Sequence, residues 1–210
     1  MTNRLHQGDL AADVDLGPVV AIDTETMGLA LGRDRLCLVQ LSAGDGDAHL
    51  VQIAPPTPGE RPTAPHLQRL LADPRVLKLF HFGRFDIASL YRTFGTLARP
   101  VYCTKLASKL ARTYTDRHGL KDLVKELLGL EISKQQQSSD WGADALSEAQ
   151  LAYAASDVLH LHALREKLDA MLAREARDGL ARAAFGYLPE RARLDLAGFE
   201  AMDVFSHAYP

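Results

Sequence analysis

Acidic side chains recur at three places in the sequence, with spacings that suit the binding of metal ions. The first pair, Asp23 and Glu25, ends the apolar run VVAIDTE. Because side chains alternate along a strand, two residues this far apart leave the same face of a sheet. Two neighbouring carboxylates repel each other, and a hard divalent cation removes that difficulty. The alternative is a strand end at the surface, where water solvates both acids.

The second acidic position is Asp86, which follows the apolar run at 76–82 through Gly83 and Arg84. The functional interpretation places its carboxylate at the carboxyl edge of a strand, where open sheets bind their ligands. Asp86 also begins a predicted helix, and an aspartate there can simply stabilise the helix N-terminus.

The third position combines Tyr153 with Asp157 on a predicted helix. They are four residues apart, so their side chains stack on one helix face. Ala152, Ala154 and Ala155 surround the tyrosine, and such small residues let a helix approach other backbone closely. The alternative is a helix with one buried tyrosine and one exposed aspartate.

Hydrophobic periodicity predicts the elements that must position these residues. Three neighbouring antiparallel strands are expected at 18–24, 36–43 and 48–53, and further strands at 76–82 and in PVYCT. Helices are expected at 66–73 and 85–95, in KLASKLAR and LKDLVKELLG, and as one long helix from Ser147 to about Arg177 that opens with the capping box SEAQ. Residues 131–145 are predicted to be a loop, and no structure is predicted from Leu188 onward. The order favours an α/β (α+β) fold with a central mixed sheet flanked by helices.

Composition bounds the function further. The 210 residues carry a formal net charge of −3 and an isoelectric point of about 6.2, which argues against binding of long nucleic acid through bulk positive charge and favours a short substrate. Cys37 and Cys103 are expected to be buried, reduced thiols. No segment is typical of a membrane span or a signal peptide, so we expect a cytoplasmic protein. The length predicts a single domain over 1–210, with a helical extension and tail from about residue 169.

Taken in order, AIDTETMGL, HFGRFD and YAASD resemble the motifs of the DEDD exonuclease superfamily, in its tyrosine (DEDDy) subgroup. The resemblance implies a ribonuclease-H-like, DnaQ-like fold and 3′-5′ exonuclease activity. It implies that Asp23, Glu25, Asp86 and Asp157 hold two divalent ions, Mg²⁺ or Mn²⁺. Tyr153 would then orient the attacking water. His160 and His162 follow Asp157 and are weaker candidates for a catalytic base.

A narrower resemblance runs over residues 4 to 205. The stretches RLHQGDL, RDRLCLVQLS, CTKLASKL, RTYTDRHGLK and SKQQQSSDW are similar to the nano-RNase C family of ribonuclease-D-like diribonucleotidases. This resemblance implies cleavage of dinucleotides, including linear pGpG, and a homo-oligomer in the form of a ring-like octamer. Ribonuclease D resembles the chain only to about Leu168 and continues into accessory helical domains for structured RNA. Only about forty residues follow here, so we expect no accessory helical RNA-binding domain and do not expect transfer-RNA processing.

Substrate-binding residues are predicted from the family resemblance and from the distribution of basic residues. In the diribonucleotidases the position of Leu29 looks like a wedge between two bases, although an ordinary buried loop leucine fits the sequence too. His81 is expected to contact substrate. The densest basic region, with its adjacent glutamines, is expected to hold the terminal phosphate of the substrate, or else forms a solvated helix face. Its candidates are Arg112, Arg117, His118, Lys121, Lys134 and Gln135 to Gln137.

Other functions fit the same pattern. A ribonuclease-D-like trimming of RNA 3′ ends and a DNA 3′-5′ exonuclease share the expected fold and acids. A non-catalytic nucleic-acid-binding module predicts the loss of at least one acid, and all four are present. The apolar residues near the C-terminus need cover, either from the same chain or from a neighbouring subunit.

Overall fold

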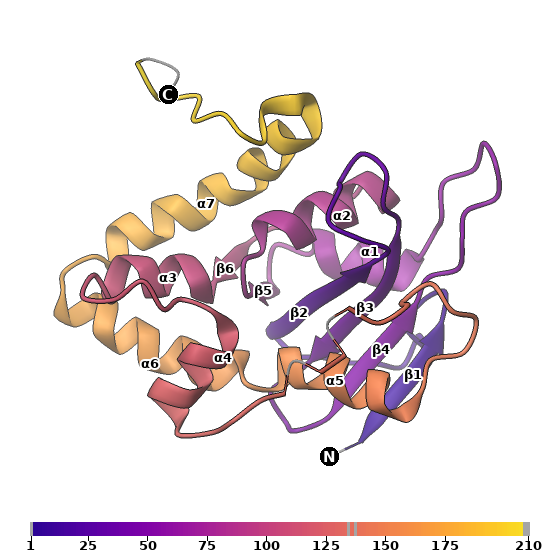
Figure 1. The fold of residues 1–210 in the computed structure, drawn as a ribbon, viewed down its shortest axis with the longest axis horizontal. Helices are drawn as coiled ribbons and strands as arrows, with labels where there is room; N and C mark the ends of the chain where they lie inside the picture. Colours follow the sequence, from indigo (N-terminus) through magenta and orange to yellow (C-terminus); the bar gives the residue numbers. More distant parts are fainter. Residues whose placement is uncertain (1, 134, 137, 208–210) are drawn as a thin grey trace.

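The computed structural model describes residues 2–133, 135–136 and 138–207. Its centre is a six-stranded sheet in the order β1-β4-β3-β2-β5-β6 (Figure 1). The strands are β1 (Asn3–Gln7), β2 (Val19–Thr26), β3 (Leu36–Ser42), β4 (Ala48–Gln52), β5 (Leu77–Phe80) and β6 (Val101–Cys103). Helices lie against the sheet, and the predicted mixed α/β fold is confirmed.

The three predicted neighbouring antiparallel strands are β2, β3 and β4. β5 and β6 continue the sheet beside β2 in parallel. The sequence analysis missed β1, which pairs in parallel with β4 at the sheet edge. The β1 residues NRLHQ are mostly exposed, so this strand has no apolar alternation from which it could be recognised.

The helices before the loop region follow the predictions closely. They are α1 (Pro65–Ala72), α2 (Arg84–Phe94), α3 (Thr104–Ala111), α4 (Leu120–Leu123) and the π-helical turn η1 (Val124–Leu128). The helices after it are α5 (Glu148–Leu159), α6 (Leu161–Arg174), α7 (Asp178–Leu194) and the turn η2 (Asp195–Phe199). Residues 131–133, 135–136 and 138–145 form no helix or strand, as predicted.

The single long helix predicted from Ser147 was wrong. The chain turns at His160, whose φ of −103° and ψ of −6° separate α5 from α6. The predicted capping box is present, since the Ser147 side chain accepts from the Gln150 backbone N–H. α5 packs on β2, β3 and β4, whereas α6 packs on α3. One straight helix cannot lie along both surfaces, so tertiary packing overrides the continuous helical periodicity.

The sequence analysis left the structure open from Leu188 onward, and the first part of this stretch is helical, as the end of α7 and the turn η2. Pro189 lies inside α7. A proline lacks the backbone N–H that a helix interior needs, so its presence in the sequence argues against a helix at this position. The turn η2 is fastened to the start of α2: the Arg84 guanidinium donates to the buried Asp195 carboxylate and, at 2.6 Å, to the Glu200 carbonyl. Arg191 pairs with the same aspartate at 3.1 Å.

Two further sequence predictions concern single features. Cys37 and Cys103 are buried free thiols, as expected. In the part of the chain that the structure describes, no helix is long and apolar enough to cross a membrane. The single-domain boundary and the cytoplasmic location remain predictions.

The ion pair between Arg84 and Asp195 provides a stability test. Asp195→Ala leaves two guanidinium groups without their shared carboxylate, so the free energy of unfolding should fall by about 2 kcal/mol. Asp178→Ala is the matched control, because it breaks the largely exposed pair with Arg182 and should cost about 0.5 kcal/mol or less. Urea denaturation measures both. Equal losses in the two variants would contradict the role given to Asp195.

Candidate active site

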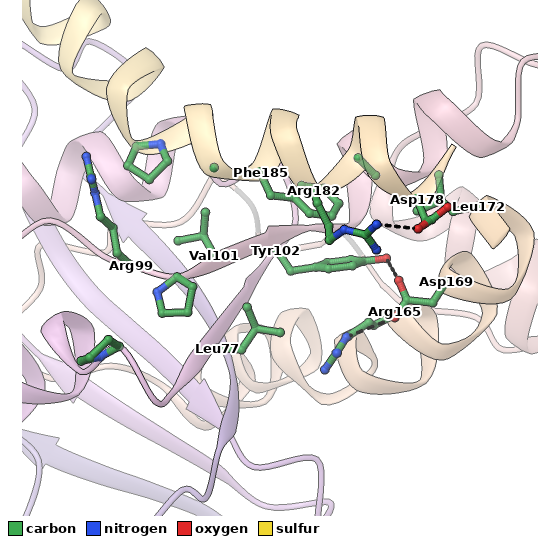
Figure 2. A pocket seen from close by; sticks show the side chains of 15 residues that line it. Leu77, Arg99, Val101, Tyr102, Arg165, Asp169, Leu172, Asp178, Arg182 and Phe185 are labelled. Atoms are coloured by element: carbon green, nitrogen blue, oxygen red, sulfur yellow. Dashed lines mark hydrogen bonds and ion pairs between the residues drawn. The ribbon is translucent and has the colours of Figure 1, made fainter. Parts of the chain in front are cut away.

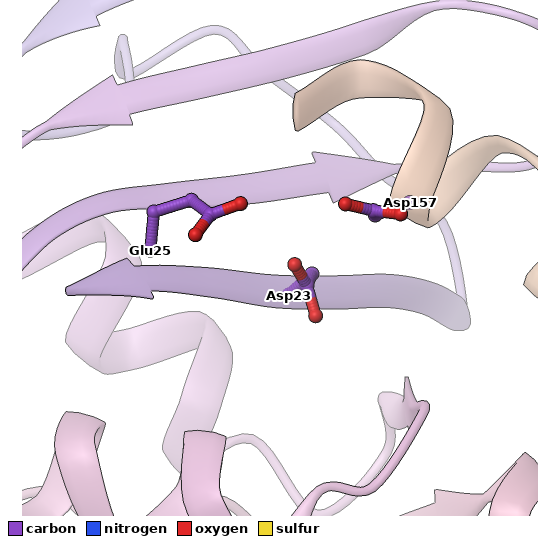
Figure 3. A group of neighbouring side chains, drawn as sticks. All are labelled: Asp23, Glu25 and Asp157. Carbon is purple, nitrogen blue, oxygen red and sulfur yellow. The ribbon is translucent and has the colours of Figure 1, made fainter. Parts of the chain in front are cut away.

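Three carboxylates meet where α5 ends above the sheet. Asp23 and Glu25 project from β2 and Asp157 from the last turn of α5, and their oxygen atoms lie within 4.8 Å of one another (Figure 3). The strand alternation predicted for Asp23 and Glu25 produces this shared face. The fold thus brings together residues more than 130 positions apart in the sequence.

Asp86 reaches the same region from the other side of β2. It lies in the first turn of α2 and is buried. The Thr24 hydroxyl donates to its carboxylate over 2.6 Å. Asp86 is not one of the three acids whose oxygens lie within 4.8 Å of one another. It lies close to Asp23 nevertheless, because among the neighbouring acids it raises the pKa of Asp23 most.

Burial and repulsion together raise the pKa values of these acids. For Asp23, burial raises the pKa well above its ordinary value, and Asp86, Asp157 and Glu25 raise it further. Burial, with Asp157 next, raises the pKa of Glu25 to about 9. Burial also raises the pKa of Asp86 to about 7, against the lowering effect of the Thr24 hydrogen bond. The acids therefore resist being ionised together.

The helix that carries Asp157 further disfavours the ionised form of this acid. Its carboxylate lies in the last turn of α5, where the partial negative charge of the helix C-terminus repels an anion. Clustered carboxylate oxygens are the ligands that Mg²⁺ and Mn²⁺ prefer, and a divalent cation would offset both sources of repulsion. The donor set therefore fits the metal ions that the sequence motifs predict.

Tyr153 lies one helical turn before Asp157. Its pKa is raised, first by burial and then by Asp157, Glu25 and Asp23. The hydroxyl therefore keeps its proton, and it hydrogen-bonds with Asp157. The ring lies 6.0 Å from that of the buried Trp141, so residues from the loop before α5 help to fix the tyrosine.

Two predicted substrate-binding residues follow strands of the central sheet, and the structure leaves them differently exposed. Leu29 follows β2 and is 81% exposed, so the alternative of a buried loop leucine was wrong. His81 follows β5, and its Nδ1 lies 2.9 Å from the Thr104 hydroxyl. That hydroxyl donates to the Phe80 carbonyl, so it accepts from the imidazole and fixes the ring.

The prediction that Arg112 holds a substrate phosphate needs correction. Its side chain is 0% exposed, and the guanidinium pairs with Glu126 and donates to Ser108 Oγ at 2.9 Å and the Arg117 carbonyl at 2.8 Å. A buried guanidinium must have its donors satisfied within the protein. Arg112 therefore joins α3 to η1 rather than facing substrate.

The other residues predicted to bind the substrate phosphate differ in their exposure and contacts. Lys134 and Gln137 lie outside the described residues. Arg117 and Lys121 are exposed, and the His118 imidazole lies 2.8 Å from Ser108 Oγ. His162 contacts the Val19 carbonyl at 3.1 Å, away from the acids.

Sequence analysis missed Thr24 and Trp141. Thr24 is recognisable in retrospect, because in DTE a hydroxyl alternates with two acids and must face the opposite side of the strand. Trp141 lies in a polar stretch without periodicity, so only the packing of that loop against α5 reveals its position.

A separate cavity of about 780 Å³ lies between β6, α6 and α7 (Figure 2). The Tyr102 hydroxyl donates to Asp169 over 2.9 Å, and Arg182 pairs with Asp178 at 2.7 Å. This cavity shares no residue with the acidic site, and these lining charges already satisfy one another.

Comparison with known proteins decides the family. A family model described as 3′-5′ exonuclease matches residues 6–173. The chain belongs to the 3′-5′ exonuclease family. Ribonuclease D of Granulibacter bethesdensis is 40% identical over 160 residues, which make up 76% of this chain and 39% of that protein. The chain thus spans less than half the length of this curated relative.

Solved structures give a fuller match. Brucella melitensis NrnC with bound Mg²⁺ is 53% identical with a TM-score of 0.93, covering 99% of this chain and 100% of that one. The same nuclease bound to pGG is 54% identical with a TM-score of 0.93 and the same coverage. The resemblance to nano-RNase C and the DnaQ-like fold are confirmed.

Glu25 allows a pH test of the metal-free protein. Its folded pKa of about 9 exceeds the ordinary value of 4.5, so between these pH values the folded chain keeps a proton that the unfolded chain has lost. Stability from this group is present at low pH and falls as the pH rises, by up to about 1.4 kcal/mol per unit. Urea denaturation in EDTA at pH 6 and pH 8 should show the loss. Glu25→Gln should make the slope shallower, and an unchanged slope would refute the assignment.

Proposed function

We propose that this chain is a metal-dependent 3′-5′ exoribonuclease that degrades short oligoribonucleotides, above all dinucleotides including pGpG, to nucleoside 5′-monophosphates. The observation that carries the proposal is the half-buried acidic site on a chain that matches NrnC, solved with Mg²⁺ and with pGG, over 99% of its length. The weak overall charge of the chain supports a short substrate.

The proposed ligands follow from the geometry of the acids. Asp23, Glu25 and Asp157 would hold one divalent ion, Mg²⁺ or Mn²⁺, because their oxygens converge. Asp23 would also contact a second ion together with Asp86, the acid that raises its pKa most. When bound, two such ions lower the pKa of a water molecule and neutralise charge on the leaving 3′-oxygen.

Tyr153 would orient the attacking water rather than remove its proton. The raised pKa of its phenol makes it a poor base, whereas its protonated hydroxyl can donate or accept a hydrogen bond at a fixed position. The reaction would cut the last phosphodiester and release a nucleoside 5′-monophosphate.

Substrate selection is assigned to surface residues around this centre. The exposed Leu29 would insert between the two bases of a dinucleotide, and His81, fixed by Thr104, would contact the substrate. Lys134 and Gln137 are still proposed to hold the 5′-phosphate. Arg112 no longer belongs to this set.

The alternative function is trimming of RNA 3′ ends or a DNA 3′-5′ exonuclease activity. The 40% identity with a ribonuclease D over the shared region favours this second candidate. A non-catalytic nucleic-acid-binding module is disfavoured, because the four acids and the tyrosine are all in place.

The assembly is proposed to be a homo-oligomer, with eight copies as the proposed number. Phe199 and Val204 are each 38% exposed and Phe205 is 76% exposed, although Leu188 of the same region is buried in the chain itself. Exposed apolar side chains that gather in one segment are typical of protein interfaces. A closed assembly would restrict access to the acidic sites and favour short substrates.

Turnover of labelled RNA tests the proposed function directly. Wild-type protein with Mg²⁺ should cleave a labelled dinucleotide much faster than a labelled 20-mer RNA or DNA. EDTA should abolish cleavage, and Mg²⁺ or Mn²⁺ should restore it. Asp23→Ala should lower the rate at least about a thousandfold, the scale of a principal electrostatic contribution. Full activity in EDTA would refute the metal mechanism, and faster cleavage of a 20-mer would favour the alternative function.

The role of Tyr153 is tested by removing its hydroxyl alone. Tyr153→Phe keeps the ring that packs near Trp141, so the melting temperature should change little. The rate should fall by about a hundredfold or more, as for other groups that position a transferred proton. A fully active variant would show that the tyrosine only fills space.

Light scattering on the purified chain tests the assembly. The expected mass is a multiple of the 23.0 kDa chain, with eight copies as the proposed number. Phe205→Ser removes one exposed apolar side chain and should shift the distribution toward smaller species. A monomer at micromolar concentration that still prefers dinucleotides would contradict both the assembly and its role in selecting substrate.

A further inference from the structure

Gln40 is a buried amide whose hydrogen-bonding groups are unsatisfied. It lies in the middle of β3 and is 0% exposed. Neither its side-chain nitrogen nor its side-chain oxygen has a hydrogen-bond partner among the residues that the structure describes. An unsatisfied buried amide destabilises a folded protein, and an apolar side chain of similar size would fill this position without that cost.

The position of Gln40 relates it to the acidic site. In the ladder between β2 and β3, Gln40 is directly opposite Asp23. Residues opposite each other in an antiparallel pair project from the same face, with their Cβ atoms about 5 Å apart. α5, which carries Asp157, covers both strands. The Gln40 amide therefore lies in the layer between sheet and helix that holds the carboxylates.

An amide offers what this environment otherwise lacks. It has two N–H donors and no net charge. It can therefore stabilise an ionised carboxylate without repelling a bound cation, whereas the charged amine of a lysine would repel the cation. The terminal torsions of glutamine and aspartate are soft, so the two groups can meet without a shift of the backbone. Carboxylates that ligate metals are themselves commonly hydrogen-bonded by a surrounding shell of residues.

We propose that Gln40 is a positioning residue for the metal site: its amide N–H donates to the Asp23 carboxylate when that carboxylate holds a divalent ion. Gln40 acts through Asp23 and touches neither the substrate nor the reacting atoms. The inference rests on the proposed function, because it requires that Asp23 is a metal ligand.

Gln40→Met tests the proposal, because methionine keeps the length and approximate volume but has no N–H donor. Calorimetric titration with Mg²⁺ and melting curves in EDTA and in Mg²⁺ are measured on the full chain. In EDTA the variant should melt at the same or a higher temperature than wild type, since it no longer buries an unsatisfied amide. Its affinity for Mg²⁺ should be about 10–100-fold weaker. Gln40→Leu serves as a second apolar variant if methionine packs poorly.

Gln52→Met is the matched control. Gln52 is a buried glutamine of β4, but its amide donates to the Ala143 carbonyl at 2.9 Å and accepts from Gln7 at 3.0 Å. Its loss should lower the melting temperature and leave the Mg²⁺ affinity unchanged. This is the opposite of the pattern expected for Gln40→Met.

Each outcome has a defined meaning. Weakened Mg²⁺ binding in the Gln40 variants alone supports the proposal. Wild-type affinity in Gln40→Met overturns it, and so does equal weakening in the Gln52 control, which would indicate a general disturbance of the sheet. If wild-type protein itself binds no Mg²⁺, the proposed metal-dependent function fails, and the inference about Gln40 fails with it.

Discussion

The repulsion among the carboxylates of Asp23, Glu25 and Asp157 is imposed by two packing arrangements. Pairing of β2 with β3 fixes two acids on one face of the sheet, and packing of α5 on that face brings the third to within 4.8 Å. Burial strengthens the repulsion, because charges are poorly screened away from water. A folded domain is stable by only about 5–15 kcal/mol, so this cluster is a substantial cost unless a cation compensates it. The arrangement of the remaining elements can be understood as support for this strained centre.

The supporting elements act from both faces of β2. The break at His160 lets α5 end above the acids while α6 turns away to pack on α3. On the other face, Thr24 fixes Asp86, and the C-terminal turn η2 fixes Arg84, two residues before it, through Asp195. The C-terminal region therefore helps to hold the start of the helix that carries an acid of the site. A site of this kind needs rigid elements, because small displacements of metal ligands weaken both binding and catalysis.

Residue type alone does not predict whether a side chain outside the acidic site is buried or exposed. Arg112 belongs to the densest basic stretch of the sequence, yet its guanidinium is buried and hydrogen-bonded within the protein. Leu29, by contrast, is an apolar residue that is 81% exposed. Composition alone would assign the arginine to the surface and the leucine to the core. The position of a side chain in the fold, rather than its residue type, therefore decides whether it can face a substrate.

The sequence by itself determined the principal strands, the helices up to η1, and the order of the acidic motifs. These depend on local alternation, periodicity and capping, which neighbouring residues specify. Local patterns could not reveal β1, the break at His160, the helix around Pro189 or the burial of Arg112, because each depends on partners far away in the chain. The same holds for Gln40. Nothing in the local sequence LVQLS indicates a role for this glutamine, and only the strand register places it opposite Asp23. Tertiary structure decided these features because hydrogen-bond satisfaction and close packing are settled between elements, not within them.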